Sequence, residues 1–413
     1  MTFIKLEFNF SKVYILFCLL FFFMYVEREL KVSFGKLVPV YGVIAVVGPR
    51  QSGKTTFLKE EAKKLESGYL LFDDPDVRNM FEADIKKFEL QFMQKKLSVF
   101  DEIQSCRNAG RNLKYLADSG KKIWLTSSSE AILSKQVLSF LVGRVSILRL
   151  YSFSLQEFFL AKNIRESTPL MMERLVFEHA TYGGYPKVVL AEDIELKKTI
   201  LKDLHETMLL KDVSQTFSIE NFNALEAFAK YLALNTGNLT AYDDISKRLN
   251  LSFQTVKKYF DAMEKSYLIK RITPFYSNKT KELAKQPKTF FIDTGLKNWI
   301  AKTFNSELDG KTFENYVFTE LLKAGFLPKY WRTKSKQEID FIIEKEKELI
   351  PIEVKLNANT EKIELNLRSF IEEYHPKNAF MVSFKEKQAS LKTYKNCKIH
   401  FVNTQNLIKQ LKK

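Results

Sequence analysis

Residues 48–55 narrow the range of folds open to this chain more than any other segment, because two glycines and a lysine lie there between an apolar stretch and an amphipathic one. These residues read Gly-Pro-Arg-Gln-Ser-Gly-Lys-Thr and fit the pattern G-x-x-x-x-G-K-[ST]. The two glycines allow the backbone to curl, so that successive amides point toward one anion. The flanking segments disfavour a chance glycine-rich turn. The sequence therefore predicts a strand, a phosphate-binding loop and a helix, in this order.

Each residue type of this loop has a physical role in holding a nucleoside triphosphate. Lys54 is expected to reach the β- and γ-phosphates, and the Thr55 hydroxyl is expected to bind Mg²⁺. The amino end of the following helix adds the positive end of its dipole. ATP and Mg²⁺ are the predicted cofactors. The predicted nucleotide-binding residues of this segment are Gly48, Pro49, Arg50, Gln51, Ser52, Gly53, Lys54, Thr55 and Thr56.

A second motif is the apolar segment 97–100, which ends in Asp101 and Glu102. In P-loop ATPases the first acid of such a pair supports the Mg²⁺ shell, and the second polarises the attacking water. Asp101 is therefore a predicted metal residue together with Thr55, and Glu102 is the predicted catalytic base. Without the loop, a plain acidic pair at the end of a strand would be the favoured interpretation.

Two further residues are candidates for contact with the γ-phosphate. Ser128 belongs to a run of hydroxyl residues that follows the strand predicted at 123–126, where hydroxyls also serve simply as caps. Arg144 is a candidate arginine finger or sensor, and an ordinary surface salt bridge is the alternative.

The rest of the pattern indicates several domains, since 413 residues exceed what one hydrophobic core holds. Alternating apolar and amphipathic segments up to residue 150 predict an α/β fold with a parallel sheet. The strands are expected at 43–47, 69–72, 97–100, 123–126 and 145–150. The predicted domains are an apolar extension (1–24), a P-loop ATPase domain (25–160), a helical extension (161–235), a winged helix (236–280) and a second α/β domain (281–413).

Residues 243–268 carry apolar side chains at helical spacing on both sides of a tight turn at 250–251, which predicts the winged helix. Ser252 is expected to cap its second helix. That helix exposes residue types that contact phosphates and base edges. A structural or protein-docking unit is the alternative. The predicted DNA-binding residues are Gln254, Thr255, Lys257 and Lys258.

Net charge and cysteine content bear on partners and compartment. The chain has 65 Lys and Arg against 49 Asp and Glu, a formal charge of +16, which favours a polyanionic partner such as DNA. A lysine-rich surface that reflects genome composition is the alternative. The three cysteines lie far apart without CxxC spacing, which argues against a disulfide framework or a zinc site and favours the cytoplasm.

The apolar run at residues 13–26 leaves three interpretations open. It is shorter than the roughly 20 apolar residues of a spanning helix, and no small-residue cleavage site follows it. Met24 could be the true start of the chain, the run could be a membrane anchor, or it could be a buried or signal segment. Membrane attachment is expected only if the run is part of the protein.

The carboxyl-terminal part carries a set of charged residues within helix and strand patterns. Glu314 lies on a predicted helix, Asp340 opens an apolar strand, and Glu353 and Lys355 share one face of another strand. Glu314, Asp340 and Glu353 are therefore a predicted Mg²⁺ site, because buried carboxylates are costly without a cation. Asp340, Glu353 and Lys355 are predicted catalytic residues, with Lys355 beside a water that attacks a phosphodiester. Edge-strand charges facing solvent, or an inactive former nuclease, are the alternatives.

These motifs together resemble those of archaeal and bacterial AAA-type ATPases that end in a domain of unknown function with a restriction-endonuclease-like PD-(D/E)xK core. The resemblance runs from about residue 25 to the end of the chain. One departure is Thr-Ser-Ser at 126–128, where the family often has Thr-Gly-Ser, and the apolar extension is another. The matching segments are 25–28, 48–56, 101–104, 143–145, 153–158, 183–186, 313–315, 338–340 and 353–355.

The resemblance implies ATP binding and a restriction-endonuclease-like carboxyl-terminal domain. The predicted function is a Mg²⁺-dependent ATPase that couples nucleotide state to DNA binding or cleavage, in a chain that could assemble as a homo-oligomer. The alternative is an ATP-switched signalling or defence scaffold, whose inactive nuclease-like domain binds DNA or protein.

Overall fold

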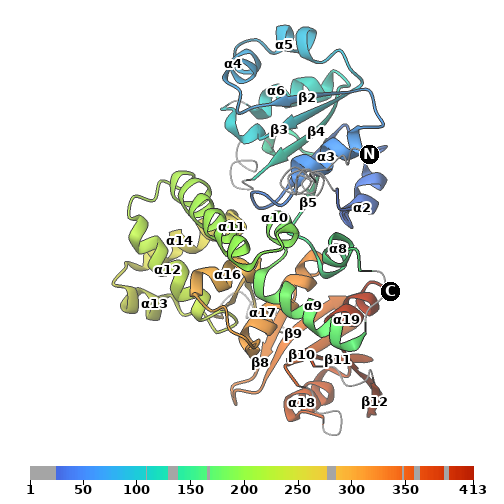
Figure 1. Ribbon diagram of the computed structural model, residues 1–413, viewed down its shortest axis with the longest axis vertical. Helices are drawn as coiled ribbons and strands as arrows, with labels where there is room; N and C mark the ends of the chain where they lie inside the picture. Colours follow the sequence, from blue (N-terminus) through green and yellow to red (C-terminus); the bar gives the residue numbers. More distant parts are fainter. Residues whose placement is uncertain are drawn as a thin grey trace, which may run out of the picture.

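The computed structural model describes residues 25–107, 109–128, 138–164, 168–276, 285–346, 348–357, 363–385 and 390–413. A parallel sheet, a central group of helices and a mixed sheet follow one another along the chain (Figure 1). Nearly all of the apolar run at 13–26 lies outside the described residues. Within the described ranges, no helix has the length and apolar character needed to cross a membrane.

The first sheet has five parallel strands in the order β2-β3-β4-β1-β5. All five predicted strands are confirmed, with ends at most two residues from the expected ones. The strands are β1 (Val43–Val47), β2 (Ser67–Leu71), β3 (Leu97–Asp101), β4 (Lys122–Ser127) and β5 (Val145–Arg149). The helices around them are α2 (Leu30–Leu37), α3 (Lys54–Ala62), α4 (Pro75–Ala83), α5 (Ile85–Phe92) and α6 (Ala109–Asp118), with short 3₁₀ turns η1 (Ile103–Ser105) and η2 (Leu138–Phe140).

Strand β1 is buried along its whole length because helices cover both faces of the sheet. Ile44 and Val46 pack with Phe34 of α2 and Phe57 of α3. The remaining side chains of β1 belong to the core on the opposite face, which includes Leu113 of α6. The loop that follows β1 is thereby held at the carboxyl edge of a rigid sheet.

The central part is helical, as predicted for residues 161–235. Its helices are α8 (Leu155–Ala161), α9 (Pro169–Tyr182), α10 (Pro186–Leu190), α11 (Ile194–Thr207) and α12 (Phe222–Leu234), with a π-helical segment η3 (Met208–Gln215) between the last two. Next come α13 (Tyr242–Leu249) and α14 (Phe253–Lys265). Two local predictions are confirmed: Asn250 is left-handed with φ 51°, and Ser252 accepts the Thr255 N–H at 3.0 Å as the cap of α14.

A two-stranded antiparallel ribbon follows these helices. It consists of β6 (Ile269–Ile272) and β7 (Lys288–Phe291), so the strand pairing crosses the domain boundary expected at residue 280. Helix α16 (Thr294–Ala301) comes next.

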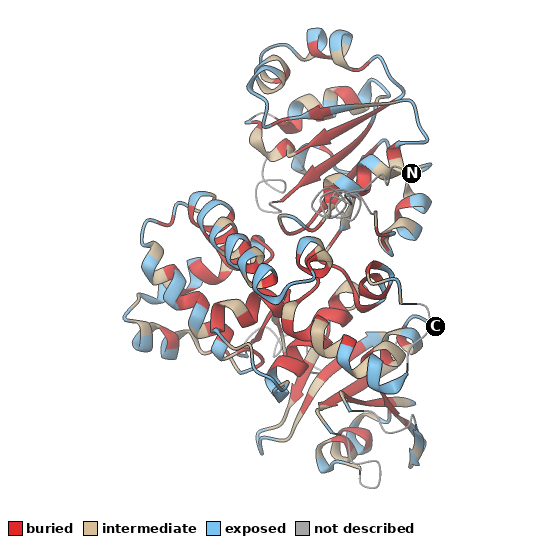
Figure 2. Cartoon of the chain, in the orientation of Figure 1, coloured by how far each residue is buried: buried red, intermediate tan, exposed pale blue. Residues whose placement is uncertain are grey.

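The second sheet has six strands in the order β12-β13-β11-β10-β9-β8, with β10, β11 and β13 parallel. The chain order is α17 (Gly310–Lys323), β8 (Lys329–Arg332), β9 (Glu338–Lys345), β10 (Glu348–Lys355), α18 (Leu365–Tyr374), β11 (Asn378–Ser383), β12 (Ser390–Tyr394), β13 (Cys397–Val402) and α19 (Thr404–Leu411). Phe341 packs with the core of α17 and α19, whereas the adjacent Ile342 packs with Phe370 of α18. Helices therefore cover both faces (Figure 2).

Buried polar contacts join the three parts of the molecule. The Asp293 carboxylate caps α16 and also accepts the Ser152 hydroxyl at 2.8 Å and the Gly184 N–H at 2.9 Å. A Cβ on Gly183 would lie 2.0 Å from the Asp293 carboxylate, which requires glycine there. Glu320 of α17 accepts the Leu155 N–H at 2.8 Å. The segment 183–186 therefore has a structural role at this junction.

Candidate functional site

The predicted phosphate-binding loop has the expected curled backbone. Gly48 has φ 152°, and a Cβ there would lie 2.1 Å from the carbonyl oxygen of Leu150. Gly53 has φ 94° and Gln51 has φ 59°, and α3 begins directly afterwards at Lys54. The loop therefore lies between the end of β1 and the positive end of a helix.

Two polar side chains of the loop, those of Lys54 and Ser52, are buried within it. Lys54 is 4% exposed, and its Nζ donates to the carbonyl oxygens of Gly48 at 3.1 Å and Pro49 at 2.9 Å. Burial lowers the pKa of its ammonium group. The Ser52 hydroxyl is fully buried, and within the described residues its Oγ has no hydrogen-bond partner. An orphaned hydroxyl and a desolvated ammonium fit a loop that receives phosphate oxygens.

The predicted metal pair lies together at the loop. The Thr55 hydroxyl donates to both carboxylate oxygens of Asp101, at 2.8 and 3.0 Å. Tyr69 of β2 donates to the same carboxylate at 2.6 Å, and the Thr126 hydroxyl also donates to it. A hydroxyl beside a held carboxylate is a donor set that Mg²⁺ accepts. Tyr69 was absent from the sequence prediction, because nothing in its own segment places it beside β3.

Glu102 lies directly beyond this pair, in a left-handed conformation with φ 56°. Its Oε2 accepts from the Gln104 amide and, at 3.2 Å, from the Ser128 hydroxyl. Its own N–H donates to the Thr126 hydroxyl at 3.0 Å. The structure therefore brings together Glu102 and Ser128 of the sequence prediction. The Thr126 hydroxyl therefore contacts both Asp101, the predicted Mg²⁺ residue, and the backbone N–H of Glu102, the predicted base.

Arg144 lies elsewhere. Residue 145 pairs with residue 43 at the start of β1, whereas the loop follows the end of β1 at residue 47. Its Nε contacts Asp118 at 2.6 Å, and both side chains are nearly half exposed. Arg144 forms the ordinary surface salt bridge that was the alternative. Its contact with a nucleotide stays a prediction, since Arg144 lies beside the start of β1 and the loop follows the end of that strand.

Arg28 supports the loop from the other side and was not predicted as a site residue. It is 5% exposed, and its guanidinium donates to the carbonyl oxygens of Ser52 at 2.8 Å and Tyr151 at 2.7 Å. Its Nε lies 3.0 Å from Glu157, whose carboxylate completes the capping box of α8 with Ser154. The motif segments 25–28 and 153–158 therefore meet at the base of the loop.

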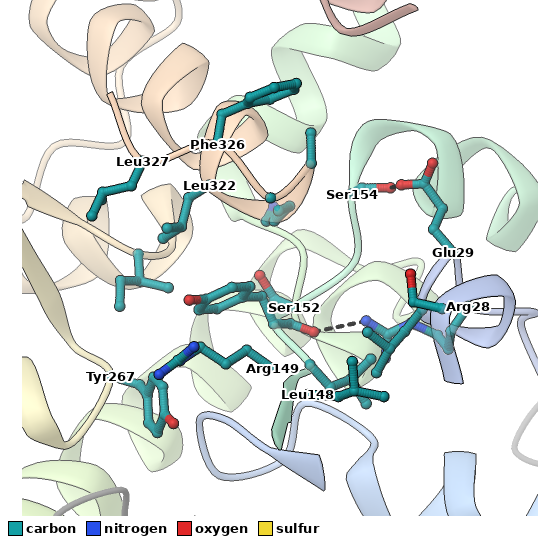
Figure 3. A pocket seen from close by; sticks show the side chains of 18 of the residues that line it. Arg28, Glu29, Leu148, Arg149, Ser152, Ser154, Tyr267, Leu322, Phe326 and Leu327 are labelled. Atoms are coloured by element: carbon teal, nitrogen blue, oxygen red, sulfur yellow. Dashed lines mark hydrogen bonds between the residues drawn. The ribbon is translucent and has the colours of Figure 1, made fainter. Parts of the chain in front are cut away.

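A cavity of about 590 Å³ opens behind this junction. Arg28 and Glu29 lie on one side of it, and Leu322, Phe326 and Leu327 on the other (Figure 3). Two lysines of its wall form ion pairs: Lys412 contacts Glu29, and Lys323 contacts Glu320.

The helical part reaches the loop at two points. Pro186 of α10 lies next to Gly53, where a Cβ would approach its ring to 4.0 Å. Arg50 of the loop pairs with Asp212 of η3 at 3.2 Å. Asp212 was also missed, because its segment carries no recognisable motif and is distant from the loop in sequence.

In the second sheet, the charges of all four predicted residues act on one another, and two of these residues, Glu353 and Lys355, are in direct contact. The Lys355 ammonium donates to Glu353 at 2.7 Å, and Asp340 accepts the Val354 N–H at 2.8 Å. Burial and the charge of Glu353 raise the pKa of Asp340, and burial raises the pKa of Glu353. Within the described residues, Oε2 of Glu353 is buried without a hydrogen-bond partner.

Glu314 was predicted to bind a metal ion, but its carboxylate contacts two lysines. One carboxylate oxygen accepts from Lys288 of β7 at 3.3 Å and the other from Lys311 at 2.9 Å. Lys288 is 1% exposed and also pairs with Glu338. No group of three or more acidic, histidine or cysteine side chains in the described part of the chain could hold a metal together. A site with Glu314 as third carboxylate does not fit this structure, because two lysines already neutralise that group.

The predicted DNA-contact residues lie near the start of α14. Gln254, Lys257 and Lys258 are exposed, and Thr255 is half-buried. The three exposed residues are three and four positions apart, so they share one helix face. Lys258 also donates to the Ser218 carbonyl oxygen at 2.9 Å.

Comparison with known proteins gives three family matches. Residues 41–159 match a family described as "AAA domain". Residues 173–307 match "Domain of unknown function (DUF8612)", and residues 309–403 match "Domain of unknown function (DUF4143)". The parallel sheet and its loop therefore form a P-loop domain of the AAA type.

Relatives that match most of the chain are also found. An uncharacterized protein of Haemophilus influenzae is 28% identical over 331 residues, covering 75% of this chain and 81% of the relative. Among solved structures, the Walker-type ATPase paby2304 of Pyrococcus abyssi has a TM-score of 0.46 and 12% identity, covering 67% of this chain and 96% of that one. The uncharacterized protein MJ1544 of Methanocaldococcus jannaschii is 30% identical over 360 residues, covering 82% of this chain and 79% of the relative. The chain therefore belongs to the family that includes MJ1544.

Proposed function

We propose that this chain is a Mg²⁺-dependent ATPase that couples its nucleotide state to the binding or cleavage of DNA. The observation that carries the proposal is the convergence of the loop lysine, the Thr55–Asp101 pair and Glu102 at one edge of the first sheet.

Each residue has a role in this proposal. The loop amides, Lys54 and Ser52 hold the phosphates, and Thr55 and Asp101 hold the Mg²⁺ shell. Glu102 accepts a proton from the attacking water, with its carboxylate oriented by Gln104 and Ser128. Mg²⁺ supplies charge neutralisation to the phosphates when it is bound.

The first test concerns Glu102. Glu102→Gln keeps the shape of the side chain but removes the base, so ATP should still bind while turnover is lost. Equilibrium dialysis with labelled ATP and a phosphate-release assay measure the two properties. Lys54→Ala is the matched control and should lose binding as well. Unchanged hydrolysis in Glu102→Gln would remove this residue from the role of base.

For the second sheet, we propose a restriction-endonuclease-like domain in which Asp340 and Glu353 hold a divalent cation and Lys355 lies beside the water. Oε2 of buried Glu353 has no hydrogen-bond partner among the residues that the structure describes. This supports the assignment, because an orphaned carboxylate oxygen is costly without a ligand. The α13–α14 unit with the β6–β7 ribbon is the proposed winged helix. The exposed face with Gln254, Lys257 and Lys258, together with Thr255, would contact DNA.

A second candidate function is an ATP-switched scaffold whose carboxyl-terminal domain binds DNA or protein without cleavage. The observation that favours it is Glu314, whose carboxylate is neutralised by two lysines. Incubation of the protein with plasmid, Mg²⁺ and ATP separates the two functions. Nicking that disappears in Asp340→Ala supports the nuclease. DNA binding without nicking supports the scaffold, and loss of that binding in Lys257→Ala would assign it to α14.

We also propose that the chain acts on ATP as a homo-oligomer, in which Arg144 reaches the nucleotide of a neighbouring copy. Its exposed position at the far edge of its own sheet supports this arrangement. Mixing Arg144→Ala with Glu102→Gln tests it, because a mixed assembly contains sites that are intact in both respects and should regain hydrolysis. No regain of activity would leave Arg144 as a surface salt bridge.

A further inference from the structure

The loop arginine and an acid of the π-helical segment form an ion pair between two parts of the molecule. Arg50 donates from Nε to both carboxylate oxygens of Asp212 at 3.3 Å, and from one Nη at 3.2 Å. The Asp212 side chain is 8% exposed, whereas Arg50 is 31% exposed. A carboxylate buried to this degree is expensive unless it is paired.

Asp212 lies close enough to the nucleotide site to affect its charged groups. Its charge acts on Lys54, and it in turn interacts with both Lys54 and Glu102. Burial raises the pKa of the Asp212 carboxyl, even though Arg50 and Lys54 oppose that shift. An anion at this position would repel a triphosphate unless a cation lies between them. Arg50 pairs with this carboxylate and supplies such a cation.

The geometry of the pair leaves part of the guanidinium available. Nε and Nη2 are engaged by Asp212 along one side of the fork. In the described part of the chain, no hydrogen bond is made by Nη1 of Arg50. The charge of Arg50 also interacts with Glu102 and Asp73, so the guanidinium lies within electrostatic range of the proposed base. A guanidinium held on one edge and free on the other is suited to a phosphate.

We propose that Asp212 is a positioning residue of the nucleotide site, which holds Arg50 so that its free Nη1 binds the terminal phosphate of ATP. This inference rests on the proposed ATPase function and extends it. Asp212 of the helical part then raises the affinity for ATP relative to ADP, although Asp212 itself does not contact the nucleotide.

This arrangement links the nucleotide to the rest of the helical part. The backbone carbonyl of Asp212 accepts the Ser266 hydroxyl at 2.6 Å, and Ser266 directly follows α14. Pro186 of α10, in the same part of the chain, lies near Gly53 of the loop. Binding of the terminal phosphate therefore favours one position of η3 relative to the loop. By linkage, a partner that binds α14 in that position tightens ATP binding, and ATP tightens the binding of that partner.

The test compares the affinities of a non-hydrolysable ATP analogue and of ADP, measured with Mg²⁺ by isothermal titration calorimetry on the full chain. Asp212→Asn should weaken the analogue about tenfold and ADP less than about twofold, because a lost charge-assisted contact costs on the order of 1.5 kcal/mol. Asp212→Glu should restore the preference. In an Arg50→Ala background, Asp212→Asn should have no further effect.

Other results would overturn the inference. An unchanged or higher ratio of analogue to ADP affinity in Asp212→Asn contradicts positioning, and an equal loss in the Arg50→Ala background assigns Asp212 a structural role. Arg50→Lys provides a second variant if Asp212→Asn does not fold. A lysine cannot serve the acid and the phosphate together, so the preference should again fall. A wild-type chain that binds neither nucleotide would refute the proposed function itself, which is a different outcome from binding without discrimination.

Discussion

Gly48 is the residue at which the nucleotide loop tolerates substitution least. Gly48→Ala would place a Cβ 2.1 Å from the Leu150 carbonyl oxygen, at φ 152°. We expect the loop to shift, nucleotide affinity to fall at least about tenfold, and the free energy of unfolding to fall by about 1–3 kcal/mol. Titration with a fluorescent ATP analogue and urea unfolding measure both effects.

Gly35→Ala is the matched control for this substitution. Gly35 lies within α2, and a Cβ there has no atom within 4 Å. Alanine should stabilise the helix by about 0.5–1 kcal/mol and leave nucleotide binding unchanged. Equal losses in both variants would mean that the contact with Leu150 does not determine the loop conformation.

Thr126 joins the two acids of the site and is fully buried. Thr126→Val removes the hydroxyl but keeps the shape, so Asp101 loses a donor and the Glu102 N–H loses its acceptor. We expect a loss of about 1–3 kcal/mol in the free energy of unfolding. Phosphate release should also slow, because Glu102 is less well held. Thr199→Val, on the exposed side of α11, should cost less than about 0.5 kcal/mol in the same urea titration.

At the scale of elements, helix α11 contains a histidine that makes the stability depend on pH. Burial lowers the pKa of His205 from 6.5 to about 4, and the charge of Lys302 adds to this shift. The unfolded chain takes up this proton near pH 6.5, whereas the folded chain takes it up only near pH 4. The unfolded state therefore binds more protons between these values. Stability from this group falls as the pH falls, by about 1.4 kcal/mol for each pH unit.

His205→Leu should reduce this dependence. Urea unfolding at pH 7, 6 and 5 should show a smaller loss of stability for the variant than for the wild type. The difference in stability loss between the variant and the wild type should reach its full size below pH 4, where His205 is protonated in both the folded and the unfolded chain. Parallel curves for the two proteins would show that His205 is solvated in the folded chain.

Most helices and strands of the first sheet and of the α13–α14 unit could be predicted from the pattern of neighbouring residues. The strands of the first sheet and the caps at Asn250 and Ser252 were predicted because apolar alternation and capping chemistry are properties of a few consecutive residues. The partner of β6 was not predicted. It is β7, which lies beyond the expected boundary, and a pairing between distant strands leaves no signature in either segment.

At the scale of the whole molecule, Lys288 ties the central part to the second sheet. It comes from β7, and its ammonium contacts Glu314 of α17 and Glu338 of β9. Lys288→Met would leave two carboxylates without their shared buried cation, which should cost about 3–5 kcal/mol of unfolding free energy. Urea unfolding of the full chain measures this loss.

Lys311→Met is the matched control, because Lys311 contacts the same Glu314 from a half-exposed position. An exposed ion pair contributes little, so this variant should lose less than about 1 kcal/mol. Similar losses for the two lysines would show that Lys288 is solvated and does not hold the two parts together.

The sequence alone determined the nucleotide loop, its acidic strand end and the strand pattern of the first sheet. These depend on the backbone freedom of glycine, the charge of a few adjacent side chains and the period of apolar residues, all of which are local. Only the tertiary structure showed that Tyr69, Arg28 and Asp212 surround the loop. It also placed Arg144 at the strand ends opposite to the loop, and it paired Glu314 with two lysines. These outcomes depend on which distant segments share one buried environment, because a charge removed from water is held by whichever partner the fold brings to it.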